Sequence, residues 1–155
     1  MELFLLNYLN VRLSNLFLVD VCQPFLNYID FFESRKVRCH LRFPKMALLL
    51  AEHMGRFINM NTAELSPKQL LKVNLEKKNW LPKSKVVVGS GVSKLVKKMR
   101  LTVESPEMMD FMESVYRFYV KSTTSLIKYF TPPLTSKILR YNILPHNTDM
   151  QHSRL

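Results

Sequence analysis

The sequence predicts an all-α protein, an irregular multi-helix bundle with one extended loop segment around residues 75–91. Apolar residues recur at intervals of three and four along most of the chain, which is the period of one helix face. The chain has 3 glycines in 155 residues, which argues against a β-sandwich or barrel because tight hairpin turns consume glycine. Serine followed by proline is typical of helix starts and occurs at Ser66-Pro67 and Ser105-Pro106.

The N-terminal region predicts two helices separated by a proline. Residues 3–17 carry leucine and phenylalanine at helical spacing. Pro24 interrupts this pattern, and proline has no N–H to donate within a helix, so we expect a second helix over residues 25–32. Residues 34–43 are rich in arginine and lysine and are expected to form a basic connection.

The next expected helices begin at prolines. Pro44 suits the first turn of a helix, where its missing N–H would be unpaired anyway, and helical spacing continues to Ile58. Ser66-Pro67 predicts a short helix through about Val73. Residues 75–91 lack helical spacing. We expect their run of three valines, 86–88, to be either a lone short strand or a buried extended segment.

Three further helices are expected before a polar tail. A short basic helix covers residues 92–99, and a long helix starts at Ser105-Pro106 and continues for about 25 residues, with Ser105 as its cap. Pro132-Pro133 ends this helix, and a last short one covers residues 135–141. We therefore expect residues 1–145 to form a single helical domain and residues 146–155 to form a polar tail.

The net charge is +11, from 23 Lys+Arg against 12 Asp+Glu, and hydrophobic residues make up 47% of the chain, which fits a globular protein. Residues 61–104 hold ten Lys/Arg against three Asp/Glu, so most of the excess lies in the middle third. Nucleic acid, anionic lipid or an acidic protein surface can bind such a patch. A solvated, lysine-rich loop that keeps the chain soluble explains the charge equally well.

No constellation of residues predicts catalysis or a metal site. The carboxylates are scattered, and those at 107, 110 and 113 fall where acids favour the start of a helix. Gly89-Ser90-Gly91 lacks the longer spacing of a phosphate-binding loop. Zinc-ligand spacing is likewise absent from the candidate ligands Cys22, Cys39, His40 and His53. We expect no enzyme activity, no cofactor, no metal and no small-molecule substrate.

The basic middle segment supplies the candidate binding residues. Its cations can neutralise phosphates of double-stranded DNA without reading sequence. Trp80 can stack on a base, although a lone tryptophan in a loop more often fills an apolar pocket. The candidate nucleic-acid-binding residues are Lys77, Lys78, Trp80, Lys83, Lys85, Lys94, Lys97, Lys98 and Arg100.

Several short motifs follow one another in an order that resembles the helical insertion region of hAT-type DNA transposases. The resemblance covers roughly residues 20–145, and it departs from the family pattern where Thr131 separates Phe130 from Pro132 and where no Ile-His pair follows Pro44. The motifs are Pro24-Phe25-Leu26-Asn27-Tyr28-Ile29-Asp30-Phe31-Phe32, Phe43-Pro44-Lys45-Met46, Trp80-Leu81-Pro82 with Val88-Gly89, Phe118-Tyr119-Val120-Lys121, Leu126-Ile127-Lys128-Tyr129-Phe130 and Leu144-Pro145.

The resemblance implies a non-catalytic fragment of a larger RNase H-like architecture. The family places three carboxylates around divalent metal on a split fold, and no residue of this sequence matches those positions. In the family the insertion helps to clasp the transposon end, which suits the basic residues 68–100. A fragment of this kind is expected to be nuclear, to expose apolar helix faces and to associate with itself or with a protein partner.

Two alternative functions also fit the sequence. The chain can be an independent basic helical module for nucleic acid. It can also be a bundle that binds a membrane surface or a partner helix through its apolar N-terminal helix. The N-terminal run is interrupted by polar residues before about 18 clean apolar residues accumulate, and no basic stretch precedes it. We therefore expect neither a transmembrane span nor a signal peptide there, and expect an intracellular protein.

Overall fold

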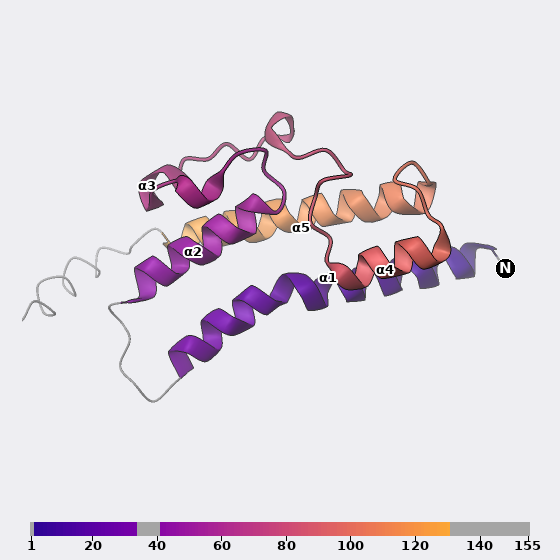
Figure 1. Ribbon diagram of the computed structural model, residues 1–155, viewed down its shortest axis with the longest axis horizontal. Helices are drawn as coiled ribbons and strands as arrows, with labels where there is room; N and C mark the ends of the chain where they lie inside the picture. The colour runs from indigo at the N-terminus through magenta and orange to yellow at the C-terminus, as the bar shows by residue number, and fades with distance from the viewer. Residues whose placement is uncertain (1, 34–40, 131–155) are drawn as a thin grey trace, which may run out of the picture.

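The computed structural model describes residues 2–33 and 41–130, and every regular element in these ranges is helical. Three longer helices, α1, α2 and α5, pack together, and α4 lies against α1 (Figure 1). The expected all-α fold is therefore confirmed. The elements are α1 (Glu2–Glu33), α2 (Arg42–Gly55), η2 (Thr62–Glu64), α3 (Pro67–Leu70), η3 (Lys77–Asn79), α4 (Ser90–Met99) and α5 (Pro106–Phe130).

The N-terminal helix α1 continues through Pro24, so the expectation of two helices separated by this proline was wrong. Proline removes one hydrogen bond, here the one to the carbonyl of Asp20, and disfavours a helix interior by about 3 kcal/mol. Packing on both sides offsets this cost, because Val21 is buried and Phe25 and Tyr28 pack against the same core. Tertiary contacts thus override the local preference of Pro24.

The aromatic ring of Tyr119 on α5 lies at the centre of the core. It is fully buried, stacks on Phe57 with ring centroids 5.2 Å apart, and meets Phe17 of α1 edge-on at 5.5 Å. Burial raises the pKa of its hydroxyl to about 12. Through this ring α1, α5 and the segment that follows α2 share one apolar core.

The helix α2 begins at Arg42, two residues before the expected start, and ends at Gly55 rather than Ile58. Pro44 still lies in the first turn, where no intrahelical N–H bond is lost. Phe57 and Ile58 are buried in the turn beyond the helix, and both donate their backbone N–H to the Met54 carbonyl. These two apolar side chains continue the helical spacing in the sequence, so the predicted helix end lay three residues beyond the true one.

The helix α3 covers only Pro67–Leu70 and is shorter than expected, but its start has the expected form. The Ser66 backbone N–H donates to Gln69 Oε1 at 2.9 Å within a capping box. Ser105 behaves differently from its expected capping role, because its hydroxyl donates to the carbonyl of Thr102 before α5 begins. Proline at the first helical position therefore marks both starts more reliably than the serine does.

Residues 71–89, the extended segment, run between α3 and α4 without an α-helix, and contain turns at 71–72 and 83–85 and the 3-10 turn η3; the last two residues of the expected range 75–91 belong to α4. Leu81 and Val87 donate their backbone N–H to the carbonyls of Phe57 and Arg56 at 2.7 and 3.0 Å. Within the described residues, the Leu81 bond and the Asn59 N–H donating to the Asn79 carbonyl at 2.8 Å form an isolated antiparallel bridge between Ile58 and Trp80, not a strand. Of the three valines from 86 to 88, Val86 is buried, Val88 is half-buried and Val87 is exposed, so the segment is partly buried and forms no strand.

Four of the expected features lie outside the described residues: the helix over residues 135–141, the prolines at 132 and 133, the polar tail 146–155 and most of the connection 34–43. Among the helices that the structure describes, none combines the length and apolarity needed to cross a bilayer.

Candidate nucleic-acid interface

The helix α4 presents two contrasting faces. Val92 and Leu95 are buried in the contact with α1, whereas the lysines at 94, 97 and 98 are exposed. Positions three and four apart lie on the same side of a helix, so these three lysines share one outer face. Apolar packing on α1 thus fixes the direction in which the cations project.

The start of α4 is fixed by a carboxylate from another helix. Gly89 precedes α4 with φ of 92°, a conformation that L side chains rarely adopt, and Asp20 Oδ2 of α1 accepts from the Gly91 backbone N–H at 3.4 Å. A Cβ at Gly89 would lie 2.6 Å from Asp20 Cγ. An acid therefore already occupies the positive end of α4, and the Gly-Ser-Gly turn does not form an open anion site.

The end of α4 holds Arg100 in a left-handed conformation with φ of 53° and ψ of 34°. Its backbone N–H donates to the Lys97 carbonyl, and the next N–H, that of Leu101, reaches back to Val96 at 3.0 Å. This is the pattern of a helix end at which glycine is normally favoured. The chain instead carries an exposed arginine at a strained position, and such outliers motivate hypotheses of function.

The cations of α4 have no acidic partner within the described ranges. The ion pairs found there join Arg56 to Glu52 and Lys78 to Glu76, and neither includes a residue of α4. Cations that form no ion pair remain available to an anionic partner. Lys94, Lys97 and Lys98 lie on this face, and the exposed Arg100 follows at the end of α4.

The remaining candidate lysines lie on the extended segment. Lys77, Lys78, Lys83 and Lys85 are all exposed, and the ammonium of Lys78 lies 2.6 Å from Glu76. Figure 1 shows this segment running over α2 and α5, whereas α4 lies along α1. The structure therefore divides the candidate cations into two groups, one on α4 and one on the loop, rather than gathering them in a single row.

Trp80 belongs to the packing of the loop. Its ring stacks on Tyr116 of α5 with centroids 4.7 Å apart and an interplanar angle of 15°. Its indole N–H donates to the Leu75 carbonyl at 2.9 Å. One ring face and the ring N–H are thus used within the protein, an arrangement that supports the pocket-filling interpretation favoured above base stacking.

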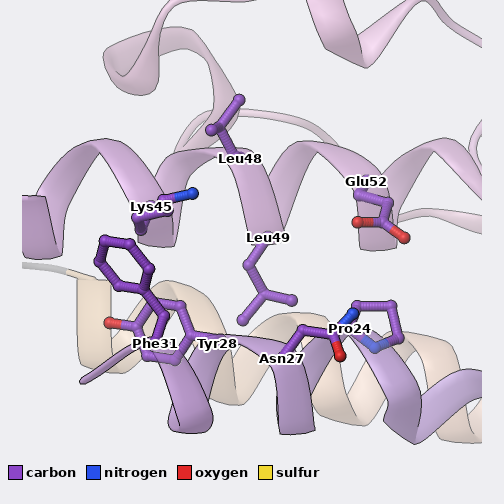
Figure 2. A pocket seen from close by; sticks show the side chains of 8 residues that line it. All are labelled: Pro24, Asn27, Tyr28, Phe31, Lys45, Leu48, Leu49 and Glu52. Atoms are coloured by element: carbon purple, nitrogen blue, oxygen red, sulfur yellow. The ribbon is translucent and has the colours of Figure 1, made fainter. Parts of the chain in front are cut away.

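A groove between α1 and α2 was not expected from the sequence. It has a volume of about 280 Å³ and is open to solvent, and the Lys45 ammonium lies 4.6 Å from the centre of the Phe31 ring beside it (Figure 2). The lining is mostly apolar, and Lys45 and Glu52 contribute opposite charges. No pattern in the sequence places these two helices side by side, so the groove could not have been predicted.

His53 is a second feature that sequence spacing missed. It is 2% exposed, its Nε2 lies 2.6 Å from Ser122 Oγ on α5, and the Ser122 hydroxyl also donates to the Phe118 carbonyl at 2.7 Å. Burial lowers the pKa of His53 to about 4, with a further contribution from Arg56. A neutral, buried imidazole thus joins α2 to α5 through the partly buried hydroxyl of Ser122.

Within residues 2–33 and 41–130, no three His, Cys, Asp or Glu side chains converge as a metal site would require. The chain matches no protein-family model, no curated protein and no solved structure.

Proposed function

We propose that this chain is a non-catalytic, hAT-type insertion-like protein that binds double-stranded DNA without sequence preference through the outer face of α4. The observation that carries the proposal is the row of Lys94, Lys97 and Lys98, exposed and free of acidic partners, on a helix whose other face is fixed against α1. Such cations bind phosphates by charge and do not read base edges.

Two further features support the proposal. Arg100 adds a cation at the end of α4 and occupies a backbone conformation that favours glycine, so its side chain is present at a cost in stability. The lysines of the loop form a second basic group in the same middle segment. The resemblance to hAT insertions implies that this segment matches the part that helps to clasp the transposon end.

The salt dependence of binding tests the proposal. Binding of a labelled 20-base-pair duplex by fluorescence anisotropy is expected to weaken with a log–log slope of about −3.6 for four phosphate contacts. That slope corresponds to an affinity loss of roughly 150-fold between 50 and 200 mM salt. Absence of binding at 50 mM salt, or a slope near zero, contradicts the proposal.

Matched variants locate the interface. The triple variant Lys94→Gln, Lys97→Gln, Lys98→Gln is expected to reduce the magnitude of the slope by about 2.7 units. The control triple Lys68→Gln, Lys121→Gln, Lys128→Gln removes the same charge from exposed positions on α3 and α5 and is expected to change the slope by less than about one unit. Equal effects of the two triples would show that net charge, not the α4 face, determines binding.

Arg100 separates binding from stability. Arg100→Gly relieves the left-handed strain and is expected to raise the free energy of unfolding by about 0.5–1 kcal/mol while weakening DNA binding. A variant that is both more stable and weaker in binding cannot owe its lost affinity to unfolding. Unchanged affinity would remove Arg100 from the interface.

A further inference from the structure

The helix α1 is apolar on the face that turns away from the core. The inner face buries Leu13, Phe17 and Val21, but six large apolar side chains on the opposite side are 41–72% exposed. At 100° per residue these six fall within an arc of about 100°, which they share with the exposed Asn15, so they form one mainly apolar stripe. The outer stripe consists of Tyr8, Val11, Leu18, Val19, Leu26 and Ile29.

The members of the outer stripe are arranged symmetrically along the helix. The midpoint lies between Leu18 and Val19, and each residue on one side has a counterpart at the same distance on the other. Val11 corresponds to Leu26, and Tyr8 corresponds to Ile29. An interface between two identical copies related by a two-fold axis must be self-complementary, and this arrangement meets that condition.

An antiparallel pair of α1 helices centred on the midpoint places counterparts at the same level. Leu18 of one copy then lies beside Val19 of the other, Val11 beside Leu26 and Tyr8 beside Ile29. The stripe spans about 32 Å at 1.5 Å per residue, which is six helical turns. The apolar members of the stripe thus lie level with one another, and Asn15 between them lies level with Cys22 of the other copy.

The outer stripe is large enough for a modest dimer. A fully exposed Val, Leu or Ile side chain presents on the order of 100 Å² and a tyrosine about 200 Å², so the exposed fractions amount to about 400 Å² in each copy. Two copies bury about 800 Å² of apolar surface, or roughly 1,300 Å² in total if about 60% of the interface is apolar. This total lies at the lower end of the range for stable interfaces.

Charge on α1 favours a second copy over a lipid surface. The helix carries Glu2, Asp20, Asp30 and Glu33 against one base, Arg12. Helices that bind anionic membranes are instead rich in lysine and arginine on their polar face. An antiparallel pair also brings Arg12 to the same edge as Asp30 of the other copy, about 8 Å away along the axis, whereas a parallel pair sets like charges level with one another.

We infer that the outer stripe of α1 is a homodimer interface in which two copies pair antiparallel about the point between Leu18 and Val19. This interface is separate from the basic face of α4, so it goes beyond the proposed DNA binding. Sedimentation velocity of the full chain between 10 and 200 μM, in 0.5 M NaCl without nucleic acid, tests it independently of phosphate contacts.

The wild-type chain is expected to show a dimer fraction that rises with concentration. Leu18→Glu and Val19→Glu are each expected to weaken dimerisation at least tenfold, because each buries a charge at the centre of the pair. The control Leu48→Glu changes an exposed leucine of α2, 64% accessible, and is expected to alter the dimer constant by less than twofold. A monomer at 200 μM, or an equal effect of the control, overturns the inference.

Disulfide trapping tests the orientation even if a glutamate variant fails to fold. In a Cys22→Ser, Cys39→Ser background, Tyr8→Cys and Ile29→Cys chains of different mass are mixed and oxidised. The antiparallel pair is expected to give the mixed disulfide in at least tenfold excess over either homodisulfide. An excess of homodisulfides, or no cross-link from a dimer, overturns the inference.

Binding to vesicles tests whether the outer stripe contacts a lipid membrane instead of a second copy of the chain. Co-sedimentation with phosphatidylcholine vesicles, with and without phosphatidylserine, is expected to be unaffected by Val19→Glu. If the chain is monomeric in solution and Val19→Glu abolishes vesicle binding, the outer stripe is a membrane-binding face and the homodimer inference is overturned.

Discussion

The layer of α1, α2 and α5 and the extended segment 71–89 are held in place by different forces. The three helices satisfy their own backbone groups and contact one another through apolar side chains such as Phe17 and Leu50. The extended segment is anchored by polar groups from elsewhere, above all the hydroxyls of Tyr116 and Tyr119, which donate to the carbonyls of Leu81 and Val87 at 2.5 and 2.7 Å. The helices of the first region have a local sequence pattern, whereas the course of the second depends on contacts with residues distant in sequence.

The largest expected loss of stability comes from a substitution at Gly89, where the extended segment meets Asp20 of α1. Gly89→Ala adds a Cβ against Asp20 of α1 in a backbone conformation with positive φ. The conformational penalty of about 1–2 kcal/mol and the overpacking penalty of about 1–3 kcal/mol together predict a loss of about 3 kcal/mol in the free energy of unfolding. Urea denaturation measures this loss.

Gly91→Ala is the matched control for the Gly89 substitution. Its added Cβ would lie 3.2 Å from Leu16 Cδ2, at the end of a flexible side chain, and alanine improves helix propensity by up to about 1 kcal/mol. We expect a change within about 1 kcal/mol of zero. If both alanine variants destabilise the chain equally, the chain has no particular requirement for glycine at position 89.

Acid is expected to weaken the helical layer through His53. Its pKa is about 4 in the folded chain against 6.5 in the unfolded chain, so unfolded chains bind more protons between these values. Stability is therefore fully present above pH 6.5 and is lost as the pH falls towards 4, by an amount on the order of 3 kcal/mol. Urea midpoints measured from pH 7.5 to 4.5 test this expectation.

The variant His53→Gln provides the comparison for the acid effect. It removes the titrating group while keeping a polar side chain beside Ser122. We expect the variant to be less stable at pH 7.5 but to lose less stability on acidification than the wild type. Parallel pH profiles for the two chains would assign the acid sensitivity to other groups.

A smaller loss of stability is expected when the hydrogen bond from Tyr119 to the extended segment is removed. Tyr119→Phe keeps the stack on Phe57 but removes the donor to the Val87 carbonyl, at an expected cost of about 1–2 kcal/mol. Amide exchange is expected to accelerate in residues 80–88 more than in α2. The control Tyr129→Phe changes an exposed hydroxyl, 71% accessible, and is expected to have no measurable effect.

The accuracy of the sequence-based predictions follows the same division. Helical spacing and Ser-Pro starts predicted α2, α4 and α5 to within a few residues, because these signals depend on neighbouring positions. Pro24 misled the prediction because the packing that tolerates it comes from other helices. The fold class and most helices could therefore be predicted, whereas helix continuity through a proline could not.

The candidate site was predictable only in part. Counting lysines identified the cations at 94, 97 and 98, and the helical period placed them on one face. Nothing in the spacing indicated that Asp20 would occupy the start of α4, or that His53 would meet Ser122, 69 residues away. These contacts depend on how helices distant in sequence approach one another.

The two tyrosine anchors have a consequence for synthesis on the ribosome. The donors at 116 and 119 follow their acceptors at 81 and 87 by 35 and 32 residues. The extended segment therefore leaves the ribosome well before the helix that fixes it, and contacts of high sequence separation form slowly. Until α5 has emerged, the carbonyls of Leu81 and Val87 lack their tyrosine donors, and the extended segment is held only by its contacts with the chain that precedes it.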